Sequence, residues 1–233
     1  GLRPLIMSSV LRRMGMTAVA RVLKVETRAA AGPHQLGIGT ADGCAKAYHS
    51  VCVLARQRPD KVVMAYDVKA AHQSLFRDFM KAEVHAYCPE LDEPLAVWYP
   101  DDEVTEHWWR NAKGDVIEIC SERGVDQGDP LANAAFGIST RRLAQESLEA
   151  LLALDPEAQL FQYADDTQSY LDAEYVPQAE AIVEEKWAEA GLELNKTKTK
   201  IWSYNPEVIL PEDFQQYRTD RLRCLGSDLI DDR

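Results

Sequence analysis

Two adjacent aspartates, Asp165 and Asp166, are the first residues of this sequence whose spacing indicates chemistry. They lie in FQYADDTQSY (residues 161–170), which reads as two short β-prone runs joined by a tight turn. Neighbouring side chains of a strand point to opposite faces, so only a turn holds two adjacent carboxylates near one spot. Such oxygens suit Mg²⁺ or Mn²⁺, and a pair of these ions can assist phosphoryl transfer. The alternative is a solvated turn, where Asp-Asp is common.

Two ions need a third acid, and Asp67 is the candidate. It ends the apolar run KVVMAYD (residues 61–67), which predicts a buried strand. An aspartate at a strand end can also be a helix cap. Between the two acidic segments, RGVDQGDPL (residues 123–131) is a polar loop with two glycines, where backbone can approach a nucleotide closely. A long helix is predicted after it, over residues 131–154.

These segments and three others resemble, in order, the motifs of reverse transcriptases, most closely those of non-LTR retrotransposons and group II intron-like enzymes. The six matching segments are RPLI (3–6), DVKAAH (67–72), GVDQGDPL (124–131), YADD (163–166), GLELNKTKT (191–199) and LRCLG (222–226). Any one of them could arise by chance, but six in the family's order make chance improbable.

The resemblance implies an α+β fold: the palm and partial fingers of a right-hand polymerase, with an antiparallel palm sheet backed by helices and the thumb absent. Residues 1–60 would be partial fingers and residues 61–233 the palm, with a fingers-type insertion within residues 88–122. The five palm motifs, A to E, would occupy residues 61–72, 123–137, 161–170, 191–200 and 221–230.

The resemblance also implies an RNA-directed DNA polymerase core that uses two Mg²⁺ or Mn²⁺ ions. Asp67, Asp165 and the carbonyl of Val68 would bind the metals, and Asp166 would support the site. Lys198 could donate a proton to pyrophosphate, or be a solvated residue of a basic run. The residues expected at the nucleotide are Arg3, Val68, Ala71, His72, Gln127 and Gly128, and those of the primer grip are Leu225 and Gly226.

Two positions depart from the family pattern. His72 stands where the family has Phe or Tyr, which exclude a ribose 2′-hydroxyl, so discrimination against ribonucleotides is expected to be relaxed. Ala132 and Asn133 replace the common Ser-Pro or Gly-Pro, and little consequence is expected there.

The expected partners are an RNA template, a DNA or RNA primer, dNTPs, and other domains of a larger retroelement polyprotein. Three alternatives stay open: a catalytically inactive scaffold, a truncated retroelement remnant, and RNA-templated RNA synthesis. The net charge of −12 is unusual for a protein that grips phosphates, but residues 1–60 hold nine basic and three acidic residues, net +6. Template binding is therefore expected to be weak and salt-sensitive.

Composition excludes several other classes. No apolar run approaches the roughly 20 residues of a membrane span, so no membrane partner is expected. The five cysteines are scattered without a C-x-x-C pair, which is typical of reduced core thiols in the cytosol or nucleus. A helix is predicted over residues 10–23, with Ser8 or Ser9 as its cap, apolar residues on one side and arginines on the other. Trp108 and Trp109 fall in a predicted hairpin, where packing is favoured over stacking on bases.

Overall fold

The computed structural model describes residues 8–100, 105–224 and 227–229 of the 233-residue chain. The helices are α1 Val10–Val22, α2 Lys24–Ala30, α3 Gly43–Gln57, α4 Ala71–Ser74, α5 Arg77–Tyr87, α6 Asp92–Trp98, α7 Ala132–Ser139, α8 Arg141–Leu154 and α9 Val176–Ala188. The strands are β1 Lys61–Tyr66, β2 Thr105–Arg110, β3 Val116–Ser121, β4 Gln159–Tyr163, β5 Asp166–Asp172, β6 Lys200–Ser203, β7 Leu222–Cys224 and β8 Ser227–Leu229.

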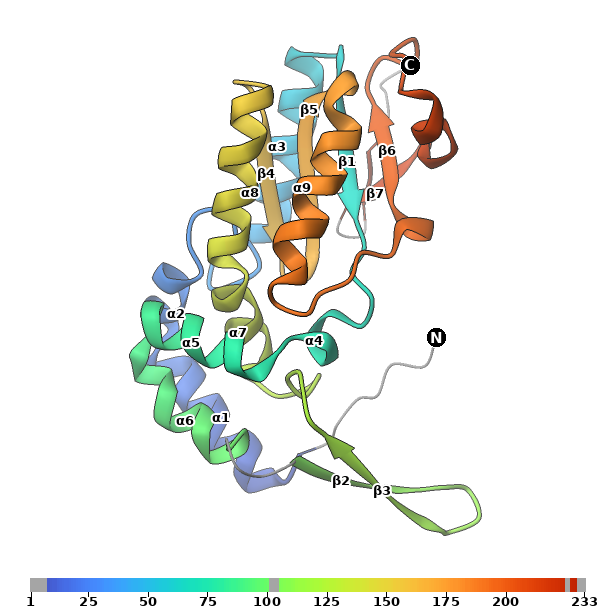
Figure 1. Cartoon of the computed structure of the whole chain (residues 1–233). Helices are drawn as coiled ribbons and strands as arrows, with labels where there is room; N and C mark the ends of the chain where they lie inside the picture. The colour runs from blue at the N-terminus through green and yellow to red at the C-terminus, as the bar shows by residue number, and fades with distance from the viewer. Residues whose placement is uncertain (1–7, 101–104, 225–226, 230–233) are drawn as a thin grey trace.

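A four-stranded antiparallel sheet in the order β4-β5-β1-β6 forms the body of the molecule (Figure 1). Helices α8 and α9 cover one face, where Val62, Met64 and Leu171 belong to the larger apolar core. Helix α3 and the β7–β8 hairpin cover the other face, where Val63 and Tyr170 lie in a second cluster. Both faces are thus buried over much of the sheet, which explains the near-continuous apolar run of β1.

Below the sheet, α1, α2, α5 and α6 form a helical lobe, and the β2–β3 hairpin projects from it (Figure 1). The hairpin was predicted from its alternation and its glycine turn, and Gly114 has a φ of 91° there. Trp108 and Trp109 are 66% and 53% exposed, so both rings are largely accessible on the hairpin. No helix among the described residues is long and apolar enough to cross a membrane.

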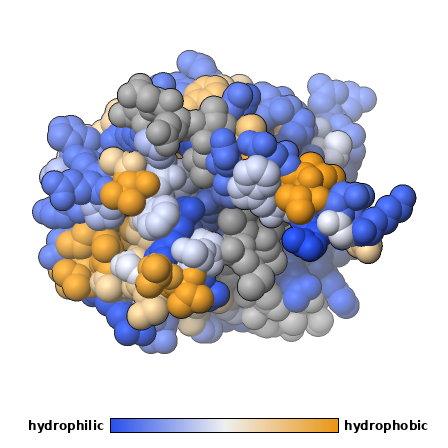
Figure 2. Space-filling view, turned by 90° about the horizontal axis from the view of Figure 1, so that it is seen from below, coloured by the Kyte–Doolittle hydropathy of each residue, from blue (hydrophilic) through white to orange (hydrophobic). Residues whose placement is uncertain are grey.

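Helix α1 begins where predicted, because the Ser9 hydroxyl accepts a hydrogen bond from the Arg12 backbone N–H at 3.3 Å. Met16 is buried and Arg13 and Arg21 are exposed, but other positions of the helix break the predicted separation of apolar residues from arginines. Arg12 points inward, whereas Leu11 and Met14 are largely exposed. Figure 2, which views the molecule from this lower end, shows apolar patches among its hydrophilic surface. The physical reason is that two buried carboxylates lie beneath Arg12, and an unpaired buried charge costs more than an exposed leucine.

Three other expectations need correction. The helix predicted over 131–154 is interrupted at Thr140, between α7 and α8. Residues 33–40, whose sequence also predicts a strand and a turn, contain only one bridge, between Gln35 and Gln162. All five cysteines are free; Cys88 and Cys224 are buried and Cys52 packs partly buried against the core, but Cys44 and Cys120 are exposed, so a core position was wrong for these two.

Candidate active site

The turn that carries Asp165 joins β4 to β5. Tyr163 pairs with Asp166, which leaves Ala164 and Asp165 as the two turn residues. Ala164 has a φ of 54°, a left-handed conformation that is uncommon for a residue with a Cβ. The buried Gln35 side chain holds it there: Gln35 Oε1 accepts from the Ala164 N–H at 2.8 Å, and Gln35 Nε2 donates to the Ala164 carbonyl at 3.1 Å. A tertiary contact thus fixes the conformation of the aspartate turn.

A glycine on the neighbouring segment lets the two chains meet. A Cβ at Gly37 would lie 2.5 Å from the Ala164 nitrogen, and Gly37 N–H also donates to Gln35 Oε1 at 2.9 Å. The absence of a side chain at Gly37 is therefore a condition for the turn to pack as it does.

The register of the sheet brings Asp67 beside Asp166. The last pair of β1 and β5 is Tyr66 with Thr167, and beyond it lie Asp67, which directly follows β1, and Asp166, the first residue of β5. Strand alternation puts both side chains on the sheet face of Val63 and Tyr170, away from α8 and α9. Residues nearly a hundred positions apart in sequence converge at one sheet end.

Asp67 is anchored from a second direction by the segment that follows α9. Asn195 Nδ2 donates to Asp67 Oδ2 at 3.0 Å, and the Asn195 N–H donates to the Asp67 carbonyl at 2.7 Å. Lys198 Nζ lies 3.3 Å from Asp67 Oδ2. Val68 forms a bridge with Leu194. The motif at residues 191–199 therefore delivers Lys198 directly to the first predicted metal ligand.

The donor set suits hard divalent cations, since it combines carboxylates with the nearby Val68 carbonyl. Within the described residues, however, no group of three or more His, Cys, Asp or Glu side chains is arranged to hold a metal. Both carboxylate oxygens of Asp67 have partners, Asn195 and Lys198. A cation at Asp67 would have to compete with the Lys198 ammonium, so the chemistry of the residues fits a metal while their side-chain arrangement is not that of a formed metal site.

The predicted nucleotide loop is tied to the segment that follows Asp67. Val125 N–H donates to the His72 carbonyl and Gly124 N–H to the Leu75 carbonyl, both at 2.7 Å. A Cβ at Gly124 would lie 2.4 Å from the Gln73 Cα, so this approach requires glycine. Gln73 Nε2 donates to Gln127 Oε1 at 3.1 Å. Gln127 and its neighbour Gly128 are thereby brought to the segment that holds Ala71 and His72.

His72 is 6% exposed and held on two sides. Its ring stacks on Phe136 with centroids 4.8 Å apart, and Nε2 lies 3.0 Å from Asn133 Oδ1. The two departures from the family pattern, His72 and Asn133, therefore contact each other. The sequence distance of 61 residues gave no signal of this pairing.

Three predicted residues, Arg3, Leu225 and Gly226, lie outside the described part of the chain. The strands that flank the predicted primer grip are described, and they pair as a hairpin. Cys224 Sγ lies 3.7 Å from Gln168 Oε1, which places this hairpin on the same sheet face as Asp67 and Asp166.

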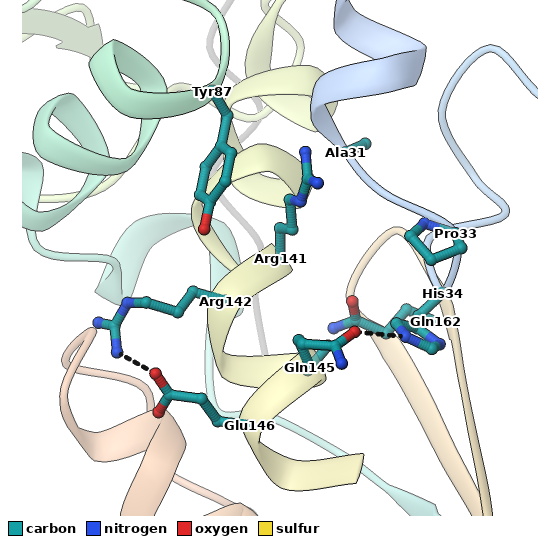
Figure 3. A pocket seen from close by; sticks show the side chains of 10 residues that line it. Ala31, Pro33, His34, Tyr87, Arg141, Arg142, Gln145, Glu146 and Gln162 are labelled. Carbon is teal, nitrogen blue, oxygen red and sulfur yellow. Dashed lines mark hydrogen bonds and ion pairs between the residues drawn. The ribbon is translucent and has the colours of Figure 1, made fainter. Parts of the chain in front are cut away.

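A cavity of about 320 Å³ lies near the opposite face of β4, between the sheet and the helices (Figure 3). Gln162, adjacent to Tyr163, lines it together with Tyr87, Arg141 and Gln145. The predicted catalytic residues do not line this cavity, so it is separate from the candidate active site.

Comparison with known proteins agrees with this geometry. Residues 1–229 match the family model described as reverse transcriptase (RNA-dependent DNA polymerase). No curated protein matches the chain. Among solved structures, apo telomerase from Candida tropicalis truncated from its C-terminal domain is similar at 14% identity and a TM-score of 0.60, over 93% of this chain and 45% of that one. Apo telomerase from Candida tropicalis is similar at 13% identity and a TM-score of 0.65, over 92% of this chain and 38% of that one.

Telomerase from Candida albicans in complex with a TWJ fragment of telomeric RNA gives 13% identity and a TM-score of 0.52, over 95% of this chain and 36% of that one. The chain thus spans less than half the length of these structures. At such identities the likeness shows the fold, the palm and fingers of a right-hand polymerase. Because the family model matches almost the whole sequence, the chain belongs to the reverse transcriptase family.

Proposed function

We propose that this chain is the RNA-directed DNA polymerase core of a retroelement, which transfers nucleotides from dNTPs to a DNA or RNA primer on an RNA template. The observation that supports the proposal is the pairing of β1 with β5, whose last pair, Tyr66 with Thr167, is followed by Asp67 on one side and preceded by Asp166 on the other. A solvated turn or a helix cap would not require two distant segments to converge. The RNA in the Candida albicans telomerase complex supports an RNA template.

Asp67, Asp165 and the Val68 carbonyl are the residues that would hold two divalent ions, with Asp166 in support. Bound there, such ions would activate the primer 3′-hydroxyl and neutralise charge on the leaving pyrophosphate. Lys198, already beside Asp67, would then be released to donate a proton to the pyrophosphate. Gln127, Gly128, Ala71 and His72 would border the nucleotide, with Arg3 on its triphosphate and Leu225 and Gly226 against the primer.

The proposed division of the chain keeps partial fingers in residues 1–60, an insertion within residues 88–122 and the palm in the remainder of residues 61–233. The β2–β3 hairpin lies in that insertion. The retroelement origin, with further polyprotein domains, rests on the order of the six sequence motifs.

Primer extension on poly(rA) with oligo(dT), dTTP and Mg²⁺ tests the polymerase proposal. We expect incorporation by the native chain, none above background by Asp165→Asn, and native rates for the control Asp78→Asn on the exposed surface of α5. Equal incorporation by native protein and Asp165→Asn would overturn the assignment of the site. Replacing dTTP with UTP on poly(rA) tests RNA synthesis.

A non-catalytic RNA-binding scaffold is the second candidate, and one observation favours it: Asn195 and Lys198 occupy both oxygens of Asp67. It predicts that the native chain binds RNA but extends no primer with either Mg²⁺ or Mn²⁺. The same assay therefore separates the two functions.

A further inference from the structure

Arg12, in the first turn of α1, reaches the loop that carries Gln127 and Gly128. Arg12 is 7% exposed. Its Nη1 lies 2.9 Å from Asp126 Oδ2, while Nε and Nη2 donate to Asp129 Oδ2 at 3.0 and 2.8 Å. One side chain from the start of the chain thus joins two carboxylates of a loop more than a hundred residues away.

The two carboxylates lie on either side of the predicted nucleotide-contacting pair. Asp126 precedes Gln127, and Asp129 follows Gly128, whose φ of 113° lies in the region that favours glycine. The Asp129 N–H donates to the Asp126 carbonyl at 2.9 Å, and Asp129 Oδ1 accepts from the Leu131 N–H at 2.8 Å. The loop is a tight turn whose two ends are both attached to Arg12.

Neighbouring elements hold the same junction. Tyr99 Oη, at the end of α6, accepts from Arg12 Nη2 at 3.1 Å and from the Asp126 N–H at 3.0 Å. His107 Nε2, on β2, lies 3.2 Å from Asp126 Oδ1. The Arg12 guanidinium also lies over the Trp98 ring, 4.8 Å from its centroid. Contacts from α1, α6 and the projecting hairpin therefore meet at the base of the loop.

Electrostatics make Arg12 necessary for this loop shape. Two buried carboxylates three residues apart repel each other unless a cation lies between them. Burial lowers the pKa of Arg12, but the nearby oxygens of Tyr99, Asp126 and Asp129 outweigh that effect and raise it, so the charge is retained. A guanidinium can contact both acids at once because its N–H groups form a planar fork, which a lysine lacks.

We propose that Arg12 is a positioning residue for nucleotide binding. By forming ion pairs with both Asp126 and Asp129, it fixes the backbone of Gln127 and Gly128 in the conformation that receives the incoming nucleotide. This proposal rests on the proposed polymerase function for its ligand, but the order that Arg12 imposes on the loop can be measured without catalysis.

The chain offers a matched comparison in a second buried ion pair. Lys61 Nζ lies 2.7 Å from Asp155 Oδ2, and both side chains are almost fully buried. Lys61 is the first residue of β1 and therefore lies at the end of that strand opposite Asp67. Lys61→Met should destabilise the fold as Arg12→Met does, but it should leave the conformation of the 123–131 loop unchanged. Arg21→Met, on the exposed surface of α1, controls for loss of positive charge from that helix.

The experiment measures amide hydrogen exchange in the 123–131 loop, followed by the KM for dNTP and kcat at a temperature where every variant is folded. We expect Arg12→Met to increase the rate of amide exchange in the loop, with little change in β5. It should also raise the KM for dNTP about tenfold or more, with a smaller fall in kcat, because a buried charged hydrogen-bond network is lost. Arg12→Lys should give a smaller change in both quantities. Lys61→Met and Arg21→Met should leave the KM near the native value.

Unchanged loop exchange in Arg12→Met, or an equal rise in KM for Lys61→Met, would overturn the proposal. If Arg12→Met fails to fold, the same two measurements are made on Arg12→Lys and Asp129→Asn. Asp129→Asn weakens the ion pair but retains an oxygen for the Leu131 N–H. Native loop exchange and native KM in both variants would overturn the proposal. If the native chain extends no primer, the polymerase proposal fails, and the proposed role in nucleotide binding fails with it. The exchange measurement then still shows whether Arg12 orders the loop, so the two failures are distinguishable.

Discussion

Gln35 forms two hydrogen bonds with the backbone of Ala164, the residue before Asp165. Gln35→Leu keeps similar bulk but leaves the Ala164 N–H and carbonyl without these partners, at a cost of about 1–3 kcal/mol in unfolding free energy. We expect kcat to fall by an order of magnitude or more, because the aspartate turn loses its fixed geometry. Denaturant unfolding and primer extension provide the measurements. A Gln35→Leu enzyme with native kcat would contradict the role.

Lys198 is expected to affect rate more than stability. Its ion pair with Asp67 is largely solvent-exposed, so its loss should cost at most about 1 kcal/mol. Lys198→Ala should lower the rate of nucleotide addition by about 10²-fold or more if the ammonium is the general acid. Lys198→Arg keeps the charge but donates a proton poorly, and should resemble Lys198→Ala in single-turnover assays. A fully active Lys198→Arg would show that only the positive charge matters.

His72 governs the prediction on sugar selectivity. His72→Phe restores the ring type that the family carries, loses the contact with Asn133 and keeps the stack on Phe136. We expect it to raise the ratio of kcat/KM for dNTP over rNTP by about tenfold, since a larger ring without a polar atom rejects the 2′-hydroxyl more strongly. Asn133→Leu in the native background is the companion variant, and it should change selectivity in the same direction by less. Equal selectivity in native protein and His72→Phe would refute the idea.

The Lys61–Asp155 pair should stabilise the fold over a defined pH range. Burial raises the pKa of Asp155, but hydrogen bonds from Lys61 and from two backbone N–H groups outweigh it and lower the pKa below its ordinary value. The stabilisation is therefore complete above the unfolded value of about 3.9 and is lost as pH falls through the lower folded value. Lys61→Met should reduce the unfolding free energy at pH 7 by about 3–5 kcal/mol, because Asp155 stays buried without its cation.

Urea unfolding between pH 3 and pH 7 measures this effect. The double variant Lys61→Met, Asp155→Asn removes both charges and should recover part of the lost stability. A Lys61→Met protein as stable as the native chain at pH 7 would show that the pair is not coupled to folding.

The exposed tryptophans of the β2–β3 hairpin are expected to bind single-stranded template. Trp108→Ala and Trp109→Ala should change unfolding free energy by no more than about 0.5 kcal/mol, because neither ring is in the core. A ring that stacks on a base should weaken template binding by about 1–3 kcal/mol when it is removed. Fluorescence anisotropy with labelled RNA at two salt concentrations measures this, with Glu118→Gln as the hairpin control. Native affinity in both tryptophan variants would exclude stacking.

The sequence predicted the parts of the molecule that depend on local pattern. The apolar run before Asp67, the turn at Asp165 and the helix cap at Ser9 all follow from residue order, and the structure confirms them. The residues that support the site could not be predicted in the same way. From the sequence alone, Arg12 is predicted to be a surface residue of an amphipathic helix. Only the structure shows that it contacts Asp126 and Asp129. Gln35 likewise shows no local sign of its contact with Ala164, 129 residues away.

Gly37 has a consequence for judging which copies of such a gene remain active. Replacing it with alanine would drive a methyl group to within 2.5 Å of the Ala164 nitrogen and displace the segment that presents Asp165. All three aspartates would still be present in the reading frame. A survey that scores related sequences by their acidic residues alone would count this one as intact, although a single methyl group outside all six motifs had displaced the turn.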